Sequence, residues 1–181
     1  GVVSKVGSGV SHIKAGDRVV YAQSGLGAYS SVHNVPADKA AILPDAISYE
    51  QAAASFLKGL TVFYLLRKTY EIKPDEPFLF HAAAGGVGLI ACQWAKALGA
   101  KLIGTVGSAQ KAQRALDAGA WQVINYREEN IVERVKEVTG GKKVRVVYDS
   151  VGKDTWEASL DCLQRRGLMV SFGNASGPVT G

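Results

Sequence analysis

The chain has 181 residues, of which 47% are hydrophobic and 20% are charged, and its formal net charge is +5 at pH 7. This composition is typical of a globular protein and excludes a disordered or fibrous chain. No apolar stretch reaches the roughly 18–20 residues that a membrane span needs, and no signal-like segment opens the sequence. The basic residues are scattered, which favours a solvated surface over a nucleic-acid footprint.

The cysteines indicate the cellular location of the protein, and the first residues indicate whether the sequence is a piece of a longer chain. Cys92 and Cys162 lie far apart in apolar helical patterns without C-x-x-C spacing. The two thiols therefore predict neither a metal centre nor a disulfide framework, and they favour a cytoplasmic location. The chain begins inside the apolar run "GVVSKVG" without a Met, so we expect an internal piece of a longer protein.

The segment 1–47 carries strand and turn signals. The runs "GVVSKVG" and "DRVVYA" are rich in β-formers, and the stretch "SGVSHIKAGD" between them is typical of turns. These strands are too few to close a β domain without leaving unpaired edges. We therefore predict a truncated β domain here.

The segment 48–76 is predicted to be a helical linker. Ser48 followed by Gln51 forms a capping-box pattern at its start. Residues 49–68 continue with helical periodicity, and Gly59 predicts a break or kink. The stretch "KPDEP" ends the linker.

From residue 77 to residue 181 the chain alternates between strand and helix patterns. The predicted strands are 78–84, 100–107, 121–126, 143–152 and 168–174, and the predicted helices are 86–99, 108–120, 128–141 and 154–167. This alternation predicts parallel strands joined by right-handed crossovers. We therefore expect an α/β fold, a doubly wound parallel sheet of the Rossmann type whose last strand is missing.

The stretch "HAAAGGVG" at residues 81–88 is close to the G-x-G-x-x-G fingerprint of dinucleotide-binding proteins. Ala83 stands at the first glycine position, while Gly85 and Gly88 fill the other two. The loop follows a predicted strand and opens a predicted helix, which is the context that the fingerprint requires. Gly85 and Gly86 give the backbone room to approach a pyrophosphate. The alternative is a glycine-rich turn needed only for packing.

The residues after the second predicted strand indicate which dinucleotide binds. An NAD site has an Asp or Glu about 20 residues after the loop, but Gly107, 19 residues after Gly88, is followed by "SAQKAQR". Ser108, Lys111 and Arg114 instead offer a hydroxyl, helix N–H groups and cations to a 2′-phosphate. The sequence therefore favours NADPH. The alternative is that Lys111 and Arg114 are solvated helix charges.

Other candidate site residues follow from topology, since ligands bind beyond the carboxyl ends of such strands. Tyr126, after the third strand, is placed on the adenine side. Val151 and the segment Phe172, Gly173 and Asn174 are candidates for the nicotinamide side. Asp149 is interpreted as a helix cap.

Several other chemistries lack their motifs. His12, His33 and His81 have no Cys or acid at metal-ligand spacing, so no metal site is predicted and His81 is interpreted as structural. Neither a G-x-S-x-G elbow nor a G-x-x-x-x-G-K-[ST] loop occurs. No general acid or base is identified, so the catalytic residues are unknown.

A family resemblance adds to these inferences. The stretches "AAAGGVG", "AGDRVVY" at 15–21, "GAYSSV" at 27–32 and "GLTVFYLL" at 59–66, with Gln93, resemble the medium-chain dehydrogenase/reductase superfamily. The chain is most similar to its zinc-free NADPH:quinone oxidoreductase (ζ-crystallin-like) branch. The resemblance implies a homodimer whose subunit has a GroES-like β domain, part of which is residues 1–47, and a Rossmann domain.

The resemblance also implies a reaction and cofactor contacts. It implies hydride transfer from NADPH to a small-molecule quinone without zinc. The implied contacts are Thr61 and Tyr64 near the nicotinamide, Gly86 and Val87 at the pyrophosphate, Gly107, Ser108 and Lys111 at the 2′-phosphate, Tyr126 at the adenosine, and Val151 and the segment after Phe172 at the nicotinamide edge.

Two other functions stay open. One is an enoyl or alkenal reductase, also zinc-free and NADPH-dependent. The other is a non-catalytic crystallin-like or RNA-binding role, although no RNA-recognition signature is visible. Because part of the catalytic domain is absent from the sequence, we expect the 181-residue chain alone to bind cofactor weakly and to reduce quinones poorly.

Overall fold

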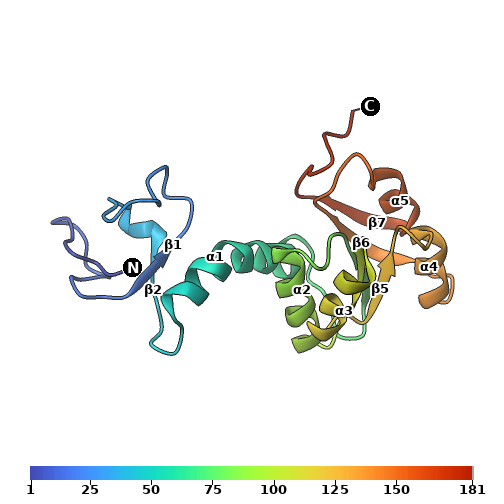
Figure 1. Cartoon of the computed structure of the whole chain (residues 1–181), viewed down its shortest axis with the longest axis horizontal. Coiled ribbons are helices and arrows are strands. Elements are labelled where there is room, and N and C mark those ends of the chain that lie inside the picture. The colour runs from blue at the N-terminus through green and yellow to red at the C-terminus, as the bar shows by residue number, and fades with distance from the viewer. Residues whose placement is uncertain (181) are drawn as a thin grey trace. The chain divides into compact units, whose positions relative to one another are not determined.

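The computed structural model describes residues 1–180, which form two compact units (Figure 1). The first unit is Gly1–Leu60 and the second begins at Thr61. Gly181, the last residue of the predicted dinucleotide-binding domain, lies outside the described residues. The predicted domain boundaries at 47/48 and 76/77 stay predictions.

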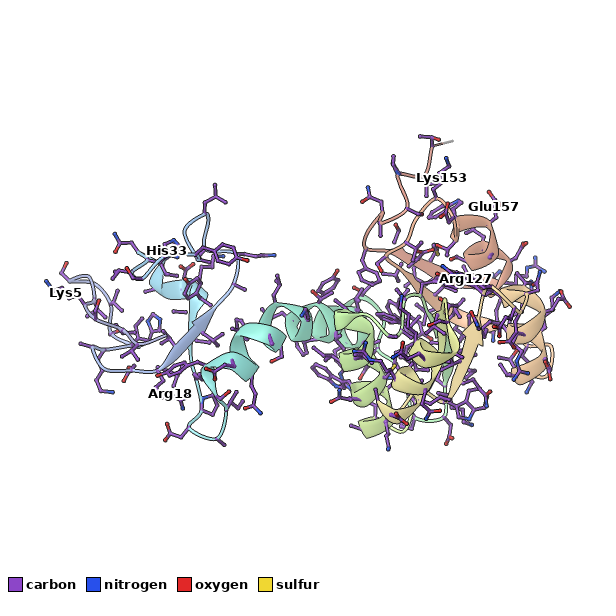
Figure 2. All side chains as sticks on the ribbon, viewed as in Figure 1. Lys5, Arg18, His33, Arg127, Lys153 and Glu157 are labelled. Carbon is purple, nitrogen blue, oxygen red and sulfur yellow. The ribbon has the colours of Figure 1, made fainter. Side chains whose placement is uncertain are left out.

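The first unit is built on a short antiparallel pair of strands. Strand β1 (Val19–Tyr21) pairs with β2 (Ala40–Ile42), which follows the 3₁₀ turn η1 (Ala37–Lys39). The Arg18 guanidinium donates to the carbonyls of Pro44 and Ile47 at 3.2 and 2.7 Å. Arg18 and His33 are labelled in Figure 2.

Helix α1 (Tyr49–Phe63) begins at the predicted capping box. The Ser48 N–H donates to Gln51 Oε1 at 2.9 Å, and the Gln51 N–H donates to Ser48 Oγ at 3.1 Å, which confirms it. The predicted break at Gly59 is wrong, because α1 continues through it. A single glycine costs a helix only about 1 kcal/mol, which its neighbours offset.

A π-helical turn, η2 (Tyr64–Thr69), follows α1 directly. The Tyr70 N–H donates to the Leu65 carbonyl at 3.3 Å, which is the wide i→i+5 bond of a π-turn. The buried Tyr148 hydroxyl donates to the same carbonyl at 2.9 Å. Burial raises the pKa of Tyr148, so its hydroxyl keeps the proton that this bond needs. Strand β6 thus fixes the π-turn through the Tyr148 side chain, a contact that no local sequence pattern predicts.

The second unit holds a five-stranded sheet in which every strand pair is parallel, in the order β5-β4-β3-β6-β7. Its strands are β3 (Pro77–Phe80), β4 (Lys101–Val106), β5 (Gln122–Asn125), β6 (Val144–Asp149) and β7 (Leu163–Ser171). Its helices are α2 (Gly86–Ala97), α3 (Ala109–Asp117), α4 (Ile131–Val138) and α5 (Trp156–Asp161). The predicted alternation of parallel strands and helices is confirmed.

Helices cover both faces of this sheet, as Figure 1 shows with α2 and α3 on one side and α4 and α5 on the other. One core joins Phe78 and Phe80 of β3 to Ala91 and Ala95 of α2. The second core contains Leu79, the β3 residue between them, with residues such as Ile103, Ile124, Val135 and Val147. Successive side chains of a strand point to opposite faces, so β3 supplies both cores. The sheet is therefore doubly wound, as a Rossmann-type fold requires.

The predicted boundaries are most in error at two places, before the glycine loop and between the last helix and the strand predicted over 168–174. The strand predicted over 78–84 ends at Phe80, because Ala82 adopts a left-handed conformation (φ 54°) and turns the chain toward α2. The helix predicted over 154–167 ends at Asp161, and β7 begins at Leu163. Pairing of β7 with β6 overrides the helical preference of "QRR", and the register between the strands shifts there.

The strand order places a switch point at β3. From β3 the chain crosses through α2 to β4 on one side, and β6 pairs with β3 on the other side. Loops that leave such a point in opposite directions open a crevice at the carboxyl ends of the strands. None of the described helices is both long and apolar enough to span a membrane.

Candidate functional site

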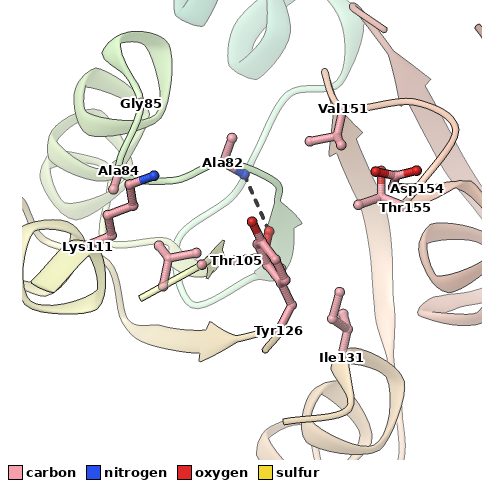
Figure 3. Close-up of a pocket in the computed structure, with 12 residues that line it drawn as sticks. Ala82, Ala84, Gly85, Thr105, Lys111, Tyr126, Ile131, Val151, Asp154 and Thr155 are labelled. Carbon is pink, nitrogen blue, oxygen red and sulfur yellow. Dashed lines mark hydrogen bonds between the residues drawn. The ribbon is translucent and has the colours of Figure 1, made fainter. Parts of the chain in front are cut away.

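A cavity of about 400 Å³ lies at the carboxyl ends of β3, β4 and β6, where the switch point predicts it (Figure 3). This volume is within the range of small-molecule sites, roughly 300–1,000 Å³. The cavity is lined by Ala82, Ala84, Gly85, Thr105, Val106, Gly107, Lys111, Tyr126, Ile131, Val151, Asp154 and Thr155.

The loop 81–85 forms one wall and is hydrogen-bonded to the strands on both sides. The His81 N–H donates to the Tyr148 carbonyl of β6 at 3.0 Å, and the Ala83 N–H donates to the Thr105 carbonyl of β4 at 3.0 Å. The Gly85 N–H closes the turn on the Ala82 carbonyl at 2.9 Å. The loop is therefore held by hydrogen bonds to the ends of β4 and β6.

Ala83, at the fingerprint's first glycine position, is fully buried against β4. Its methyl group occupies the space above Gly104, where a Cβ on residue 104 would lie 2.5 Å from the Ala83 Cβ. The missing glycine of the loop is thus matched by a glycine in the neighbouring strand. The left-handed residue of the turn is Ala82, so Ala83 needs no glycine conformation.

Gly85 and Gly88 bring helix α2 close to the loop. A Cβ on Gly88 would lie 2.5 Å from the carbonyl oxygens of Ala82 and Ala83. Gly85 is the N-cap of α2 and offers no side-chain hydrogen bond to it. The first N–H groups of the helix, on Gly86, Val87 and Gly88, are therefore available to an anion, which the helix dipole also favours.

The end of β4 supplies the second wall. Ser108 caps α3 as predicted, with its side chain accepting from the Lys111 N–H at 3.3 Å. Lys111 lines the cavity and extends toward the loop at Ala84 in Figure 3. A Cβ on Gly107 would lie 2.5 Å from the Tyr126 hydroxyl, so only glycine lets the half-exposed Tyr126 ring lie there. No carboxylate occurs at residues 106–108.

The end of β6 supplies the third wall and is joined to the segment after β7. Asp149 accepts from the N–H groups of Val151 and Gly152 at 2.7 and 3.0 Å. The Ser176 N–H and hydroxyl both donate to the Val151 carbonyl at 2.8 Å. Asp149 therefore stabilises the turn after β6. The N-cap of α5 is Thr155, which corrects the interpretation of Asp149 as a helix cap.

Next to the loop lies a buried polar cluster of His81, Thr105, Ser159, Asp149 and Thr155, in which Thr105 and Thr155 also line the cavity. His81 Nδ1 lies 2.9 Å from Thr105 Oγ1, and His81 Nε2 lies 2.9 Å from Ser159 Oγ. The hydroxyls of Ser159 and Thr155 both donate to Asp149 Oδ2 at 2.7 Å. Both ring nitrogens of His81 therefore have partners, as a structural histidine requires.

The charges of this cluster follow from its surroundings. Burial lowers the pKa of His81 to about 4, although Asp149 opposes this shift, so the imidazole is neutral near pH 7. Burial would raise the pKa of Asp149, but hydrogen bonds from Thr155, the Gly152 N–H and Ser159 keep it below its ordinary value. Asp149 is therefore ionised and is held by hydrogen bonds rather than by a cation.

The structure brings some predicted site residues together and leaves others outside the cavity lining. Those that line it are Gly85, Gly107, Lys111, Tyr126 and Val151. Those that do not are Gly86 and Val87 in the first turn of α2, Ser108 at the cap of α3, Thr61 and Tyr64 at the end of α1 and the start of η2, and Phe172, Gly173 and Asn174 after β7. Their roles stay predictions.

Other lining residues were missed by sequence reasoning. They are Ala82, Ala84, Thr105, Val106, Ile131, Asp154 and Thr155. Thr105 and Val106 end a predicted strand, so the rule that ligands bind at carboxyl ends could have found them. Ile131, Asp154 and Thr155 follow loops whose path is set by tertiary packing.

No zinc ligand set is present in residues 1–180. No group of three or more His, Cys, Asp or Glu side chains there is arranged to hold a metal ion. His12 lies 2.9 Å from the Ala37 carbonyl and His33 lies 3.0 Å from the Tyr21 hydroxyl. Burial raises the pKa of Cys92 to about 11 and that of Cys162 to about 12, which disfavours the thiolate that zinc needs.

Comparison with known proteins shows the family. The sequence pattern of the zinc-binding dehydrogenases matches residues 86–180, more than half of the chain. The chain therefore belongs to the zinc-binding dehydrogenase family, part of the medium-chain dehydrogenase/reductase superfamily, which confirms the predicted superfamily.

Individual relatives are similar along the whole chain. A quinone oxidoreductase from Salmonella typhimurium is 94% identical over 181 residues, which are 100% of this chain and 55% of the relative. The crystal structure of Escherichia coli quinone oxidoreductase complexed with NADPH has 89% identity and a TM-score of 0.97, over 100% of this chain and 56% of that one. A 2-haloacrylate reductase from a Burkholderia species is 46% identical over 97% of this chain and 54% of its own length. The chain thus spans about half the length of the curated relatives that it matches.

The contact between Ala83 and Gly104 can be tested by a pair of substitutions. We expect Gly104→Ala to lower the free energy of unfolding by roughly 1–3 kcal/mol, because its Cβ would overlap the Ala83 methyl. Adding Ala83→Gly should restore most of this loss. Urea unfolding followed by tryptophan fluorescence measures both, and equal stabilities for the single and double variants would contradict the contact.

His81 predicts a pH dependence of stability. Its pKa is about 4 in the folded chain and near 6.5 when unfolded, so the unfolded chain binds more protons between these values. The free energy of unfolding should therefore fall by roughly 3 kcal/mol as the pH drops from 6.5 to 4. Urea unfolding at a series of pH values measures this. His81→Gln should abolish this part of the slope, whereas His12→Gln, on the surface of the first unit, should keep it.

Proposed function

We propose that the chain is the cofactor-binding part of an enzyme that transfers a hydride from NADPH to a quinone without zinc. The observation that carries this proposal is the cavity at the switch point, with the α2 N-terminus on one wall and Lys111 on another. The absence of a carboxylate at residues 106–108 favours a phosphate over a free 2′-hydroxyl. The names of the Salmonella and E. coli relatives support the substrate class and the cofactor.

The residues present fit NADPH. Gly88 lets helix α2 begin close against the loop, and the N–H groups of Gly86 and Val87 at its start would bind a pyrophosphate. Lys111 and Ser108 would hold the 2′-phosphate beside Gly107, and the Tyr126 ring would cover the adenosine.

The nicotinamide would lie toward the end of β6. Val151 lines the cavity there, and Phe172, Gly173 and Asn174 follow β7 next to it. The Phe172 N–H donates to the Asp149 carbonyl at 2.9 Å, and Gly173 packs against Ser150, where a Cβ would lie 2.9 Å from the Ser150 carbonyl oxygen. These contacts hold the segment beside Val151. We assign Thr61 and Tyr64 to the same end on the resemblance alone.

NADPH, when bound, supplies the hydride, and the protein supplies binding, orientation and electrostatics. In this chain the helix N-terminus and Lys111 neutralise phosphate charge. The apolar side chains of Val106, Ile131 and Val151 exclude water from the cavity wall. No described side chain is assigned as a general acid or base.

The wider organisation is also a proposal. We assign residues 1–47 to a GroES-like catalytic domain, 48–76 to a linking segment and 77–181 to the dinucleotide-binding domain. We propose a cytoplasmic homodimer, on the resemblance to ζ-crystallin-like quinone oxidoreductases. The 181-residue chain alone should be a poor catalyst, because it spans about half the length of its relatives.

One observation favours a second candidate, reduction of an activated carbon–carbon double bond. The Burkholderia relative that is 46% identical to the chain is named 2-haloacrylate reductase. An enoyl or alkenal reductase would use the same NADPH site, so only the substrate distinguishes the two.

The cofactor preference depends on Lys111. We expect NADPH to bind more tightly than NADH, and Lys111→Ala to weaken NADPH binding by roughly 1.5–3 kcal/mol, the scale of a charged hydrogen bond. NADH binding should change little. Lys142→Ala is the control, since Lys142 is exposed after helix α4 and lies outside the cavity lining. Fluorescence titration measures the affinities of all three proteins for both cofactors, and equal binding of NADPH and NADH by the unmodified protein would contradict the assignment.

The substrate class is tested by turnover. A form of the protein extended to the length of its relatives should oxidise NADPH faster with 1,4-benzoquinone than with an α,β-unsaturated ketone or 2-chloroacrylate. NADPH absorbance measures both rates. Faster reduction of the double bond would favour the second candidate.

A further inference from the structure

A continuous chain of hydrogen bonds leads from the buried Asp149 carboxylate to the loop that lines the cavity. It passes from Asp149 Oδ2 to Ser159 Oγ at 2.7 Å, and from Ser159 Oγ to His81 Nε2 at 2.9 Å. From His81 Nδ1 it reaches Thr105 Oγ1 at 2.9 Å, and from there the Ala82 N–H at 3.4 Å. Figure 3 marks this last bond with a dashed line. The cofactor contacts proposed above include none of Asp149, Ser159 and His81.

The chemistry of the groups fixes the direction of each bond. The ionised Asp149 only accepts, so the Ser159 hydroxyl donates to it and must accept from His81 Nε2–H. Nδ1 of the neutral His81 is then an acceptor, and the Thr105 hydroxyl donates to it. Thr105 therefore turns a lone pair, not its proton, toward the Ala82 N–H.

The loop depends on this orientation, because Ala82 is strained. A left-handed conformation costs an alanine roughly 1–2 kcal/mol, and surrounding contacts must hold it. Thr105 holds it twice, since its hydroxyl accepts from the Ala82 N–H and its carbonyl accepts from the Ala83 N–H at 3.0 Å. The Ala82 carbonyl in turn accepts from Gly85, the N-cap of α2, at 2.9 Å. The position of the α2 N–H groups is thereby coupled to Thr105.

We propose that His81 is a positioning residue for the anion-binding loop, acting through the bond from the Thr105 hydroxyl to its Nδ1. This proposal rests on the proposed function in one respect, that the anion is the pyrophosphate of NADPH. His81 is fully buried and does not line the cavity, so it acts on the ligand only through Thr105 and Ala82.

Two substitutions of His81 distinguish the hydrogen bond made by Nδ1 from the one made by Nε2. The amide of Asn reaches the place of Nδ1, so His81→Asn keeps an acceptor for Thr105 and loses the bond to Ser159. The amide of Gln reaches the place of Nε2, so His81→Gln keeps the bond to Ser159 and loses the acceptor for Thr105. Both variants remove the imidazole, and their losses of stability should be similar.

The test is fluorescence titration of the 181-residue chain and both variants with NADPH at pH 7. We expect His81→Gln to weaken binding by roughly tenfold, the scale of one hydrogen bond to a charged group, and His81→Asn to weaken it much less. In a Thr105→Val background His81→Gln should have no further effect, because the two residues act in series. Equal affinities in the two variants, or a larger loss in His81→Asn, would overturn the proposal.

A second readout needs no ligand. Hydrogen exchange at the Ala82 amide should be faster in His81→Gln than in His81→Asn, relative to the unmodified chain. If the unmodified chain does not bind NADPH, the proposed function fails, but the exchange rates still decide the role of His81. Equal exchange at the Ala82 amide in both variants would overturn that role. If either His81 variant does not fold, Thr105→Val and Thr105→Ser make the same comparison. Only Thr105→Ser keeps the hydroxyl, so weaker NADPH binding and faster Ala82 exchange in Thr105→Val would support the proposal. Equal binding and equal exchange in the two variants would overturn it.

Discussion

The attachment of the glycine loop to strand β4 is the constraint on which the candidate site depends. The Ala83 methyl fills the space above Gly104, and the Thr105 carbonyl accepts from the Ala83 N–H. Any larger side chain at 83 or 104 would separate loop and strand. The strained Ala82 persists because these contacts hold the chain on both sides of it.

From this attachment the arrangement of the cavity follows. Gly88 lies close to the carbonyls of the loop, so helix α2 begins directly behind the loop. The first N–H groups of α2 point beyond the sheet. On the other side of β3, the turn after β6 is held by Asp149. The cavity wall at the start of α2 is thus fixed by close backbone packing, and the opposite wall is fixed by hydrogen bonds to Asp149. Lys111 and Tyr126 add charge and an aromatic face.

The buried polar cluster next to the loop has a structural basis of its own. The neutral His81 and the ionised Asp149 are bridged by the Ser159 hydroxyl and form no direct ion pair, since His81 Nε2 lies 4.0 Å from Asp149 Oδ2. A buried carboxylate without a cation is costly unless each lone pair is satisfied, and here two N–H groups and two hydroxyls satisfy it. No buried side-chain nitrogen or oxygen in the described part of the chain lacks a partner.

The sequence by itself determined the parallel α/β sheet, the position of the glycine loop and the caps at Ser48 and Ser108, because periodicity, turn residues and capping are local properties. It also placed Gly85, Gly107, Lys111, Tyr126 and Val151 at the carboxyl ends where the cavity lies. Only the tertiary structure decided that the strand before the loop stops at Phe80 and that the last helix ends at Asp161. It alone joined Ala83 to Gly104 and His81 to Ser159, which is 78 residues away. Such contacts depend on which strands become neighbours, and no local pattern encodes that pairing.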